Sequence, residues 1–388
     1  MSPLVTWSRR TFLSTAGLAG AATASPRALV AEPHRATTPF LAFVGFCAPN
    51  CPATHRIEQY RVDAGNWVRL RETSCEAPRA LVMHPNLPVL YVAHCTGQHR
   101  SLPRSSVSAF TVDTRSGALV PLSCEPLALS ATYPEHLAIS PDGSALLISA
   151  SGGGAYNIHP LAVDGAILSG LHALKQTGSG PHCFQTTAHP HAAIFHPSRL
   201  TAYASDLGSD RINHIAFSDA VPTIASRVSF TPGSGPGHIA LHPSGKLLVV
   251  SNQLRPALTA VALDEETGAF SSTPQHFGLD SEVAGPLSFD PTGNYLYITT
   301  SVHSAETSIT AFRMEHGAWS MEHGNLRAIT RVRVPAIGRP EQLLVREHAI
   351  LLVGEGGIAS LTLDPCGRLT MPAEHVVRES GAASIAVL

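Results

Sequence analysis

Leu137-Ala-Ile-Ser-Pro-Asp-Gly-Ser-Ala-Leu-Leu-Ile-Ser149 is the stretch that decides the fold. It joins apolar residues, a short turn with Pro141 and Gly143, and a second apolar run of the kind that forms a buried strand. The same phrase returns at Leu81–Ala93, Ala193–Ser205, Ile239–Ser251 and Leu287–Thr299, with a degenerate copy from Leu343 to Gly354. Its turn prolines stand at positions 85, 141, 197, 243 and 291, which defines a repeat of about fifty residues.

A repeat of this length, with several short strands and turns, is typical of one blade of a β-propeller. Residues 40–388 make seven blades at about fifty residues each. The sequence therefore predicts an all-β fold, a seven-bladed β-propeller with four-stranded antiparallel blades. We expect the segments Phe40–Gly45 and Ala382–Leu388 to close the ring together. Two β-sandwiches are the alternative, but they would not repeat one turn phrase at this interval.

The composition narrows the classes of function. Of the 388 residues, 44% are hydrophobic and only 14% are charged, which argues against disorder. The 26 basic and 28 acidic residues nearly balance and form no basic block, which argues against nucleic-acid binding. The chain has no long uninterrupted apolar run, so we expect no transmembrane helix.

Residues 1–31 predict a twin-arginine signal peptide. Ser8-Arg-Arg-Thr-Phe-Leu13 fits the twin-arginine motif, and a short Ala/Gly/Leu stretch follows it. Cleavage is expected after Ala24 or after Ala31. We therefore expect a periplasmic or secreted protein that folds before export. Its residues 32–388 would form a single propeller domain, a monomer with no membrane attachment once the signal is removed.

Seven cysteines lie beyond the predicted signal peptide, at positions 47, 51, 75, 95, 124, 183 and 366. An odd number in an oxidising compartment leaves at least one thiol unpaired. Cys47 and Cys51 are close enough in sequence for a loop disulfide, but the pairing as a whole stays open. There is no Cys-x-x-Cys pair, which argues against a zinc ribbon and a c-type haem site.

Several further stretches resemble the seven-bladed propeller lactonase family, which includes the 6-phosphogluconolactonase type and the carboxymuconate-lactonising enzymes. The resemblance is carried over nearly the whole predicted domain by these segments: Tyr133–Leu137, Ser151–Gly154, His189–His191, Ala204–Arg211, Gly235–Pro243 and Val250–Leu254. It implies an enzyme that opens or forms a lactone ring in the central channel of the propeller.

Three charged positions of the family are changed in this chain. Gly237 stands where the resemblance implies an arginine, Gln253 where it implies a glutamate, and Thr300-Ser-Val302 where it implies a second arginine. Glutamine can orient a water molecule but cannot carry a proton, so the family's acid–base role cannot be inherited at position 253. Both arginines would have held an anion. We therefore expect a substrate less anionic than a sugar phosphate.

In a propeller, the residues just before each innermost strand surround one end of the channel. Counting five residues back from each turn proline gives a ring at Ala80, His136, Ala192, His238 and Pro286, with Gln342 as the degenerate equivalent. The ends of the second strands add further polar groups. We predict as catalytic residues His191, His189, Asp206 and Glu355, and as substrate-binding residues His136, His238, Asn252, Gln253, His94 and Ser151.

Histidine suits these roles because its pKa lies near neutral pH. His191 would transfer the proton, and Asp206 or Glu355 would orient it. The alternative is that His189 and His191 only form hydrogen bonds between blades. Asn252 and Gln253 could supply donors for the oxyanion of a lactone. In contrast, His84, His196 and His242 precede turn prolines and are expected only to form turn hydrogen bonds.

No cofactor and no metal site is predicted, although the 21 histidines leave a transition metal as an alternative. Four of them, His94, His136, His191 and His238, could converge in the channel and would suit zinc or copper. They lie on separate blades and show none of the local spacing of a metal motif.

Three hypotheses about function follow. The first is an exported lactonase-like enzyme that hydrolyses, or forms, a lactone of a small sugar acid or an unsaturated carboxylic acid. The second is a non-catalytic propeller that binds a ligand or partner. The third is a cyclase or isomerase acting on another substrate. Glutamates filling the vacated cleft, such as Glu135, Glu341 or Glu355, would indicate that the chemistry has moved to new positions.

Overall fold

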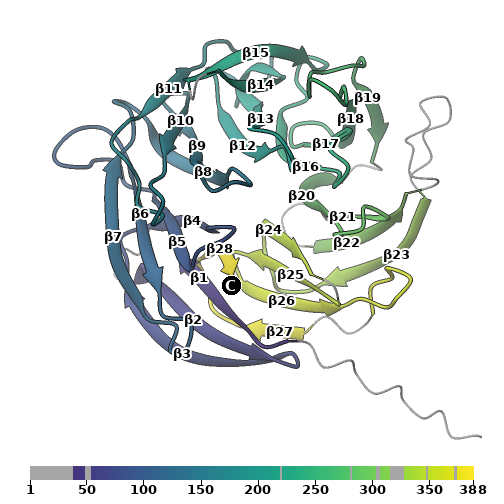
Figure 1. Ribbon diagram of the computed structural model, residues 1–388. Helices are drawn as coiled ribbons and strands as arrows, with labels where there is room; N and C mark the ends of the chain where they lie inside the picture. Colours follow the sequence, from purple (N-terminus) through teal and green to yellow (C-terminus); the bar gives the residue numbers. More distant parts are fainter. Residues whose placement is uncertain are drawn as a thin grey trace, which may run out of the picture. The chain divides into compact units, whose positions relative to one another are not determined.

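Seven four-stranded antiparallel sheets follow one another in a computed structural model of the protein, and Figure 1 shows them arranged radially around one axis. The structure describes residues 38–48, 54–218, 221–279, 282–302, 306–314, 327–346, 348–370 and 374–388, all within the compact unit Thr37–Leu388. The predicted signal peptide lies outside the described residues. The predicted seven-bladed propeller with four-stranded blades is confirmed.

Six blades are each built from four consecutive strands, and in each the strands follow one another outward from the axis in sequence order. Blade 1 holds β4 (Pro78–Met83), β5 (Val89–His94), β6 (Ser106–Val112) and β7 (Leu119–Pro126). Blade 2 holds β8 (Thr132–Ile139), β9 (Ala145–Gly152), β10 (Ala155–Pro160) and β11 (His172–Lys175). Blade 3 holds β12 (Pro190–Phe195), β13 (Thr201–Asp206), β14 (Arg211–Ser218) and β15 (Val221–Ser229), with the short 3-10 helix η2 (Leu207–Ser209) between β13 and β14.

Blade 4 holds β16 (Pro236–Leu241), β17 (Leu247–Asn252), β18 (Ala257–Ala262) and β19 (Gln275–Gly278). Blade 5 holds β20 (Val283–Phe289), β21 (Tyr295–Val302), β22 (Glu306–Arg313) and β23 (Arg327–Val334). Blade 6 holds β24 (Pro340–Val345), β25 (Ala349–Gly354), β26 (Gly357–Thr362) and β27 (Glu374–Val377). Among the described residues, the search for a helix with the length and apolarity to cross a membrane found none.

Blade 7 joins the two ends of the domain. Its innermost strand is β28 (Ala382–Val387), and the next three are β1 (Phe40–Phe46), β2 (Arg56–Asp63) and β3 (Asn66–Ser74). β1 and β28 pair antiparallel from Ala42 opposite Val387 to Phe46 opposite Ala382. This confirms that the two segments close the ring together, because one blade takes its strands from both ends of the domain.

The turn phrase of the repeat works as its residues predict. Gly143, Gly245 and Gly293 take φ values of 73°, 74° and 76°, in the left-handed region that favours glycine. The histidines before the turn prolines use Nδ1 to accept a backbone N–H two residues later, at 3.1 Å for His84, 3.2 Å for His196 and 3.1 Å for His242. The predicted turn hydrogen bonds are confirmed.

Buried tyrosines tie alternate blades to their neighbours. Tyr91, Tyr203 and Tyr297 lie at equivalent places in blades 1, 3 and 5, and each is at most 1% exposed. Their hydroxyls donate to turn carbonyls of the following blade, at Gly165 (2.8 Å), Gly268 (2.6 Å) and Gly367 (3.0 Å). A buried hydroxyl requires such a partner. The bonds therefore fix the rotation of one blade against the next.

Replacing Tyr203 with Phe removes one of these bonds and leaves the ring in place. The free energy of unfolding is expected to fall by about 1 to 2 kcal/mol, because the buried Gly268 carbonyl loses its donor. Urea-induced unfolding measures this change. Tyr133→Phe is the matched control, because Tyr133 is 57% exposed, and it should leave the unfolding free energy unchanged. An equal loss in both variants would contradict the bond's role.

Candidate active site

The innermost strands share one irregularity that aims side chains at the channel. In six blades the pairing of the innermost strand with its neighbour shifts register near the strand start, which is the mark of a β-bulge. In five of these strands a proline immediately precedes the bulged segment. The next residue after this proline, or after Ala284 in β20, enters the bulge. In blade order these residues are Arg79, Glu135, His191, Gly237, Gly285 and Glu341. One arc of the ring is therefore charged or polar, and two adjacent blades carry glycine.

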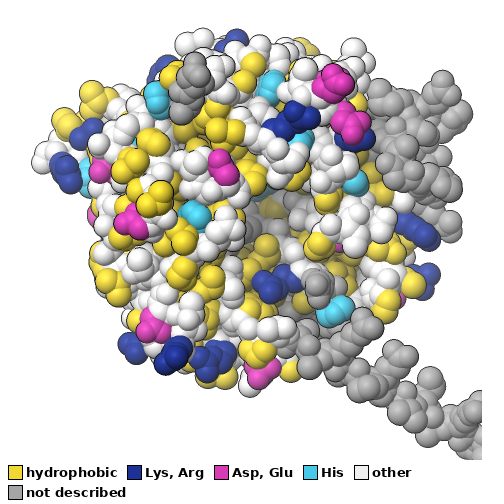
Figure 2. Space-filling view, in the orientation of Figure 1, with side chains coloured by type: hydrophobic (Ala, Val, Ile, Leu, Met, Phe, Trp, Pro, Cys, Tyr) yellow, Lys and Arg dark blue, Asp and Glu magenta, His cyan; other side chains and the backbone are white. Residues whose placement is uncertain are grey.

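These strands enclose a cavity of about 240 Å³. Its polar lining consists of three imidazoles, two carboxylates, two guanidinium groups, one amide and one hydroxyl, from His136, His191, His238, Glu135, Glu341, Arg79, Arg339, Gln342 and Ser384. Figure 2 shows this view of the ring, in which the surface is hollowed near the middle and Lys or Arg side chains lie beside the hollow. The volume suits a small molecule of a single ring.

An ionic network occupies one side of the cavity. The Arg79 Nη2 atom lies 2.9 Å from Glu341 Oε2 and 3.4 Å from Glu135 Oε2. Arg339 Nε lies 3.9 Å from the other oxygen of Glu341. Burial by itself disfavours the charged form of Arg79, but the two carboxylates outweigh it and raise the pKa of the guanidinium. Burial likewise raises the pKa of the Glu135 carboxyl, but the contact with His189 and the charge of Arg79 bring it far below its usual range.

The three imidazoles of the cavity are neutral near neutral pH. Burial lowers the pKa of His136 to about 4 and that of His191 to about 3, and it brings the pKa of His238 well below its ordinary value. The rings of His191 and His238 pack edge to face, with centroids 4.9 Å apart. Uncharged imidazoles offer hydrogen bonds rather than charge to a ligand.

Two imidazole nitrogens in this cavity have no hydrogen-bond partner. The buried Nδ1 atoms of His136 and His191 are both in this state. On the other side of the His191 ring, the Gln253 Nε2 amide lies 3.2 Å from His191 Nε2. With the amide N–H donating to Nε2, the imidazole proton stands on Nδ1. The Nδ1–H of His191 is therefore an unpaired donor with almost no solvent-accessible surface, and a ligand oxygen would satisfy it only if the ring turned toward the cavity.

Six of the ten predicted site residues meet at this cavity or its rim. His136, His191 and His238 line it. Gln253 contacts the His191 ring, and the Ser151 hydroxyl donates to Glu135 Oε1 at 2.9 Å. His189 lies just before β12, with Nε2 3.8 Å from the same Glu135 oxygen.

The other four predicted residues do not line the cavity. His94 is buried between Glu76 and Ser108, whose oxygens lie 2.6 and 2.8 Å from its two ring nitrogens. Asn252 donates to the Thr259 hydroxyl at 2.9 Å, and Glu355 is exposed beyond the end of β25. These residues end second strands, which lie one strand farther from the axis than the innermost strands.

Asp206, the fourth of these residues, is fully buried and organises the backbone around η2. Its carboxylate accepts the backbone N–H of His189 at 2.7 Å and that of Gly208 at 3.1 Å, and also bonds the Ser209 hydroxyl. It does not touch the His191 ring that it was predicted to orient. Asp206 acts instead on the neighbouring histidine, through the main chain.

Sequence reasoning omitted Arg79 and Arg339 from the site and named Glu135 and Glu341 only as possible replacements. The signal that could have found three of them is local, because Arg79, Glu135 and Glu341 each follow a proline at or near the start of an innermost strand. Glu135 and Glu341 do line the cavity, whereas Glu355 does not. Charged groups at positions other than 237, 253 and 302 therefore line the central channel of this chain.

The changed position 237 is closed by another side chain. A Cβ atom at Gly237 would lie 2.5 Å from Gln253 Nε2 and 2.6 Å from Gln253 Cγ, so Gln253 fills the space that a side chain at 237 would need. From there it reaches His191. The third changed position, Val302, is the last residue of β21.

In the described parts of the chain, no group of three or more His, Cys, Asp or Glu side chains is arranged to hold a metal ion. The transition-metal alternative therefore has no ligand set among these residues. The six described cysteines are free thiols. Cys51 lies outside the described residues, so the loop disulfide with Cys47 stays a prediction.

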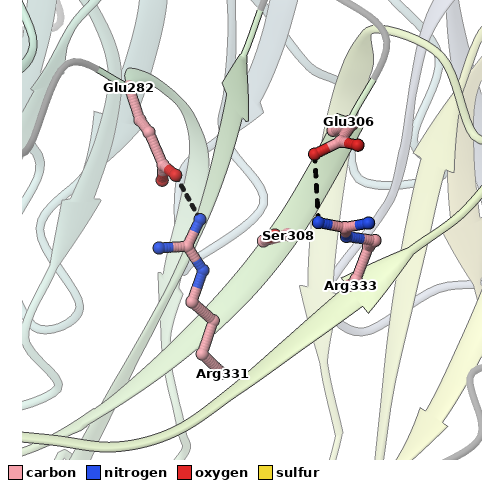
Figure 3. A pocket seen from close by; sticks show the side chains of 5 residues that line it. All are labelled: Glu282, Glu306, Ser308, Arg331 and Arg333. Atoms are coloured by element: carbon pink, nitrogen blue, oxygen red, sulfur yellow. Dashed lines mark hydrogen bonds and ion pairs between the residues drawn. The ribbon is translucent and has the colours of Figure 1, made fainter.

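A second cavity, of about 310 Å³, lies on blade 5 away from the channel. Figure 3 shows its five lining residues: Glu282 pairs with Arg331, Glu306 pairs with Arg333 at 3.1 Å, and Ser308 lies between the two pairs. Both arginines and Glu306 are more than half exposed as side chains. Each charge already has a partner of opposite sign, and the lining has none of the neutral imidazoles that line the channel.

Known proteins share both the sequence pattern and the fold. The family described as "Lactonase, 7-bladed beta-propeller" matches residues 49–341. The 6-phosphogluconolactonase of Bacillus subtilis is 27% identical over 235 residues, which are 59% of this chain and 65% of that protein. The 6-phosphogluconolactonase of Pectobacterium atrosepticum is 26% identical over 178 residues, or 43% of this chain and 49% of that one. The chain thus spans about half to two thirds of the length of these curated relatives.

Solved structures extend the likeness over nearly the whole domain. The periplasmic gluconolactonase of Pseudomonas aeruginosa superimposes with a TM-score of 0.77 at 19% identity, covering 90% of this chain and 99% of that one. A Lactobacillus plantarum protein gives a TM-score of 0.74 at 18% identity, covering 90% and 99%. At such identities the likeness shows the fold, and the family match shows the ancestry. This chain belongs to the seven-bladed β-propeller lactonase family.

Proposed function

We propose that this protein hydrolyses, or in the reverse direction forms, the lactone of a small sugar acid that carries no phosphate. The observation that carries the proposal is the set of three neutral imidazoles that line a cavity of about 240 Å³, one of which, His191, has an unpaired Nδ1 donor. The lactone of a sugar acid has one ester carbonyl and several hydroxyl groups, which neutral imidazoles can bind through hydrogen bonds. Its relatives named 6-phosphogluconolactonase support a sugar lactone as the substrate class.

The charges of the cavity argue against a phosphorylated substrate. A phosphate is best bound by arginine that is free to form two hydrogen bonds with it. Arg79 already lies between Glu135 and Glu341, and Arg339 faces the second oxygen of Glu341. A phosphate in this cavity would meet two carboxylates, so its binding would be penalised by charge repulsion.

The chemistry needs a donor for the carbonyl oxygen and a group that moves a proton. The His191 ring lines the cavity and carries its proton on Nδ1 when Gln253 donates to Nε2. A rotation of this ring on substrate binding would bring the Nδ1–H to the oxygen on which negative charge develops as water attacks the ester carbon. A histidine of the His189-Pro-His191 segment then transfers the proton of the water to the leaving ring oxygen.

We further propose that the reaction takes place outside the cytoplasm. The twin-arginine motif at Ser8–Leu13 supports export of the folded chain. The structural relative from Pseudomonas aeruginosa is described as periplasmic, which is compatible with such a location. Fractionation of cells expressing the full chain, with and without the Arg9-Arg10 pair, tests this point.

The proposed function is tested by following acid release from purified protein in a pH-stat. The substrates are glucono-1,5-lactone, its 6-phosphate and galactono-1,4-lactone. We expect the unphosphorylated lactones to have a kcat/KM at least about 10-fold higher than the phosphate, which corresponds to one unfavourable charge contact. Preference for the phosphate would contradict the substrate class. No turnover on any lactone would contradict the function and favour a binding propeller.

Replacing His191 with Ala is expected to lower kcat/KM by about 100-fold, because the oxyanion loses one positioned donor. His172→Ala, on the outer strand β11, is the matched control and should keep the wild-type rate. Thermal unfolding of both variants shows whether the fold is intact. An active His191→Ala protein would contradict the placement of the carbonyl oxygen at this ring.

A further inference from the structure

We propose that Glu135 and His189, which come from neighbouring blades, form the acid–base pair of this active site. The inference rests on the proposed lactone hydrolysis and assigns its proton transfer to a pair that joins blades 2 and 3. His189 Nε2 lies 3.8 Å from Glu135 Oε1. Such carboxylate–histidine contacts are often long in the absence of substrate and shorten when it binds.

Glu135 is held on both of its oxygens. Oε1 accepts the Ser151 hydroxyl at 2.9 Å, and Oε2 faces Arg79 Nη2 at 3.4 Å. Arg79 is itself fixed by Glu341 at 2.9 Å. The carboxylate therefore cannot turn away from His189 without losing these contacts, although 22% of its side chain is still reached by solvent.

The backbone of His189 is held from the opposite side. Asp206 Oδ1 accepts its N–H at 2.7 Å, and its carbonyl accepts the Leu207 N–H at 3.0 Å. Gly208 packs so closely that a Cβ there would lie 2.8 Å from His189 N and 1.9 Å from Thr187 O. The buried Asp206 thus positions the imidazole through the main chain while Glu135 orients the ring, with a third of the ring exposed at the rim.

The two histidines of this segment are suited to different tasks. His191 accepts the Gln253 N–H on Nε2 and carries its proton on Nδ1, so it has no free lone pair to receive another proton. In His189 the Nε2 proton faces Glu135, which leaves the lone pair of Nδ1 free. His189 is therefore the catalytic base, and Glu135 is a positioning residue that acts through it.

The proposed step keeps atoms and charge in balance. His189 Nδ1 takes a proton from water while the water oxygen bonds to the carbonyl carbon of the lactone. The bond between that carbon and the ring oxygen then breaks, and the ring oxygen leaves with the proton returned by His189. The product is an open-chain hydroxy acid, which releases its own proton to solvent.

Other titratable groups surround the pair. The charges of Arg79 and His191 affect the pKa of Glu135. The pKa of His191 is in turn affected by the charges of four groups: Glu135, His189, Arg339 and His136. Glu341 reaches the pair through Arg79. The acid limb of the kcat/KM pH profile therefore reports on the whole cluster. Removing the charge of Glu135 is expected to move that limb to lower pH, because the carboxylate raises the pKa of His191 in this cluster.

The experiment compares Glu135→Gln and His189→Gln with two matched controls, Glu282→Gln on blade 5 and His172→Gln on β11. We expect each test variant to lose about 100-fold or more in kcat with little change in KM, which is the usual cost of losing a positioned acid or base. The controls should keep the wild-type rate. Thermal unfolding is measured for all four variants, and the pH profile is recorded for Glu135→Gln.

A proton NMR signal makes the test independent of turnover. An Nε2–H of His189 bonded to Glu135 is expected as a downfield resonance that disappears in His189→Gln, moves upfield in Glu135→Gln because the neutral amide oxygen is a weaker acceptor, and is unchanged in both controls. If wild type hydrolyses lactones but Glu135→Gln keeps its rate and its pH profile, the pair is overturned and the function stands. If wild type hydrolyses none, the proposed function fails. A resonance unchanged in Glu135→Gln then overturns the pair as well.

Discussion

Lowering the pH from about 7.5 to about 5.5 is expected to reduce the free energy of unfolding by roughly 1 kcal/mol for each histidine of the cavity. Burial lowers the pKa of His136 to about 4 and of His191 to about 3, and it brings the pKa of His238 well below its ordinary value. In the unfolded chain each would titrate near pH 6.5. The three contributions act in the same direction.

The sign follows from proton uptake. Below about pH 6.5 the unfolded chain binds protons that the folded cavity excludes, so stability falls as the pH falls. The contribution of each histidine is fully present above its unfolded pKa and is lost progressively on the way down to its native value. Other histidines with lowered pKa values, such as His94 and His159, act in the same direction.

Urea-induced unfolding at the two pH values measures this effect. In His136→Asn the difference between the two pH values should shrink by about 1 kcal/mol, because asparagine takes up no proton. An unfolding free energy that is equal at both pH values would contradict the exclusion of protons from the cavity. The same measurement on His172→Asn, on the outer strand β11, serves as the control.

Asp206→Ala is expected to lower the free energy of unfolding by about 3 kcal/mol or more, the range for breaking a buried charged network. The fully buried carboxylate accepts two backbone N–H groups and the Ser209 hydroxyl, and it lies 3.7 Å from Arg211 Nε. Alanine leaves these donors without a partner. Because one of them is the His189 N–H, lactone turnover should fall as well.

Asp264→Ala is the matched control for this prediction. Asp264 also accepts two backbone N–H groups, from Glu266 at 3.2 Å and Thr267 at 2.8 Å, but it does so in a surface turn open to water. Its replacement should change stability little and leave turnover unaltered. If both aspartate variants unfold alike, the buried network around η2 does not carry the stability assigned to it.

The position of the polar ring shows where sequence reasoning stops. Counting back from the turn prolines finds His136, His238 and Gln342, which do line the cavity. The bulge at the start of each innermost strand also turns the preceding residue toward the channel, as it does for Arg79, Glu135 and Glu341. A bulge depends on how two strands pair, so no count along one strand contains it.

By itself, the sequence determined the number of blades, the Pro-x-Gly turns, the closure of the ring by both ends of the domain, and the family. These are local, repeated patterns, and each copy of the phrase carries its own turn and its own alternation of strand residues. Only the tertiary structure decided that Arg79 links Glu135 with Glu341, that Gln253 closes position 237, and that Asp206 acts on His189. Those contacts join residues from different blades or different strands, and their distances exist only once the ring has closed.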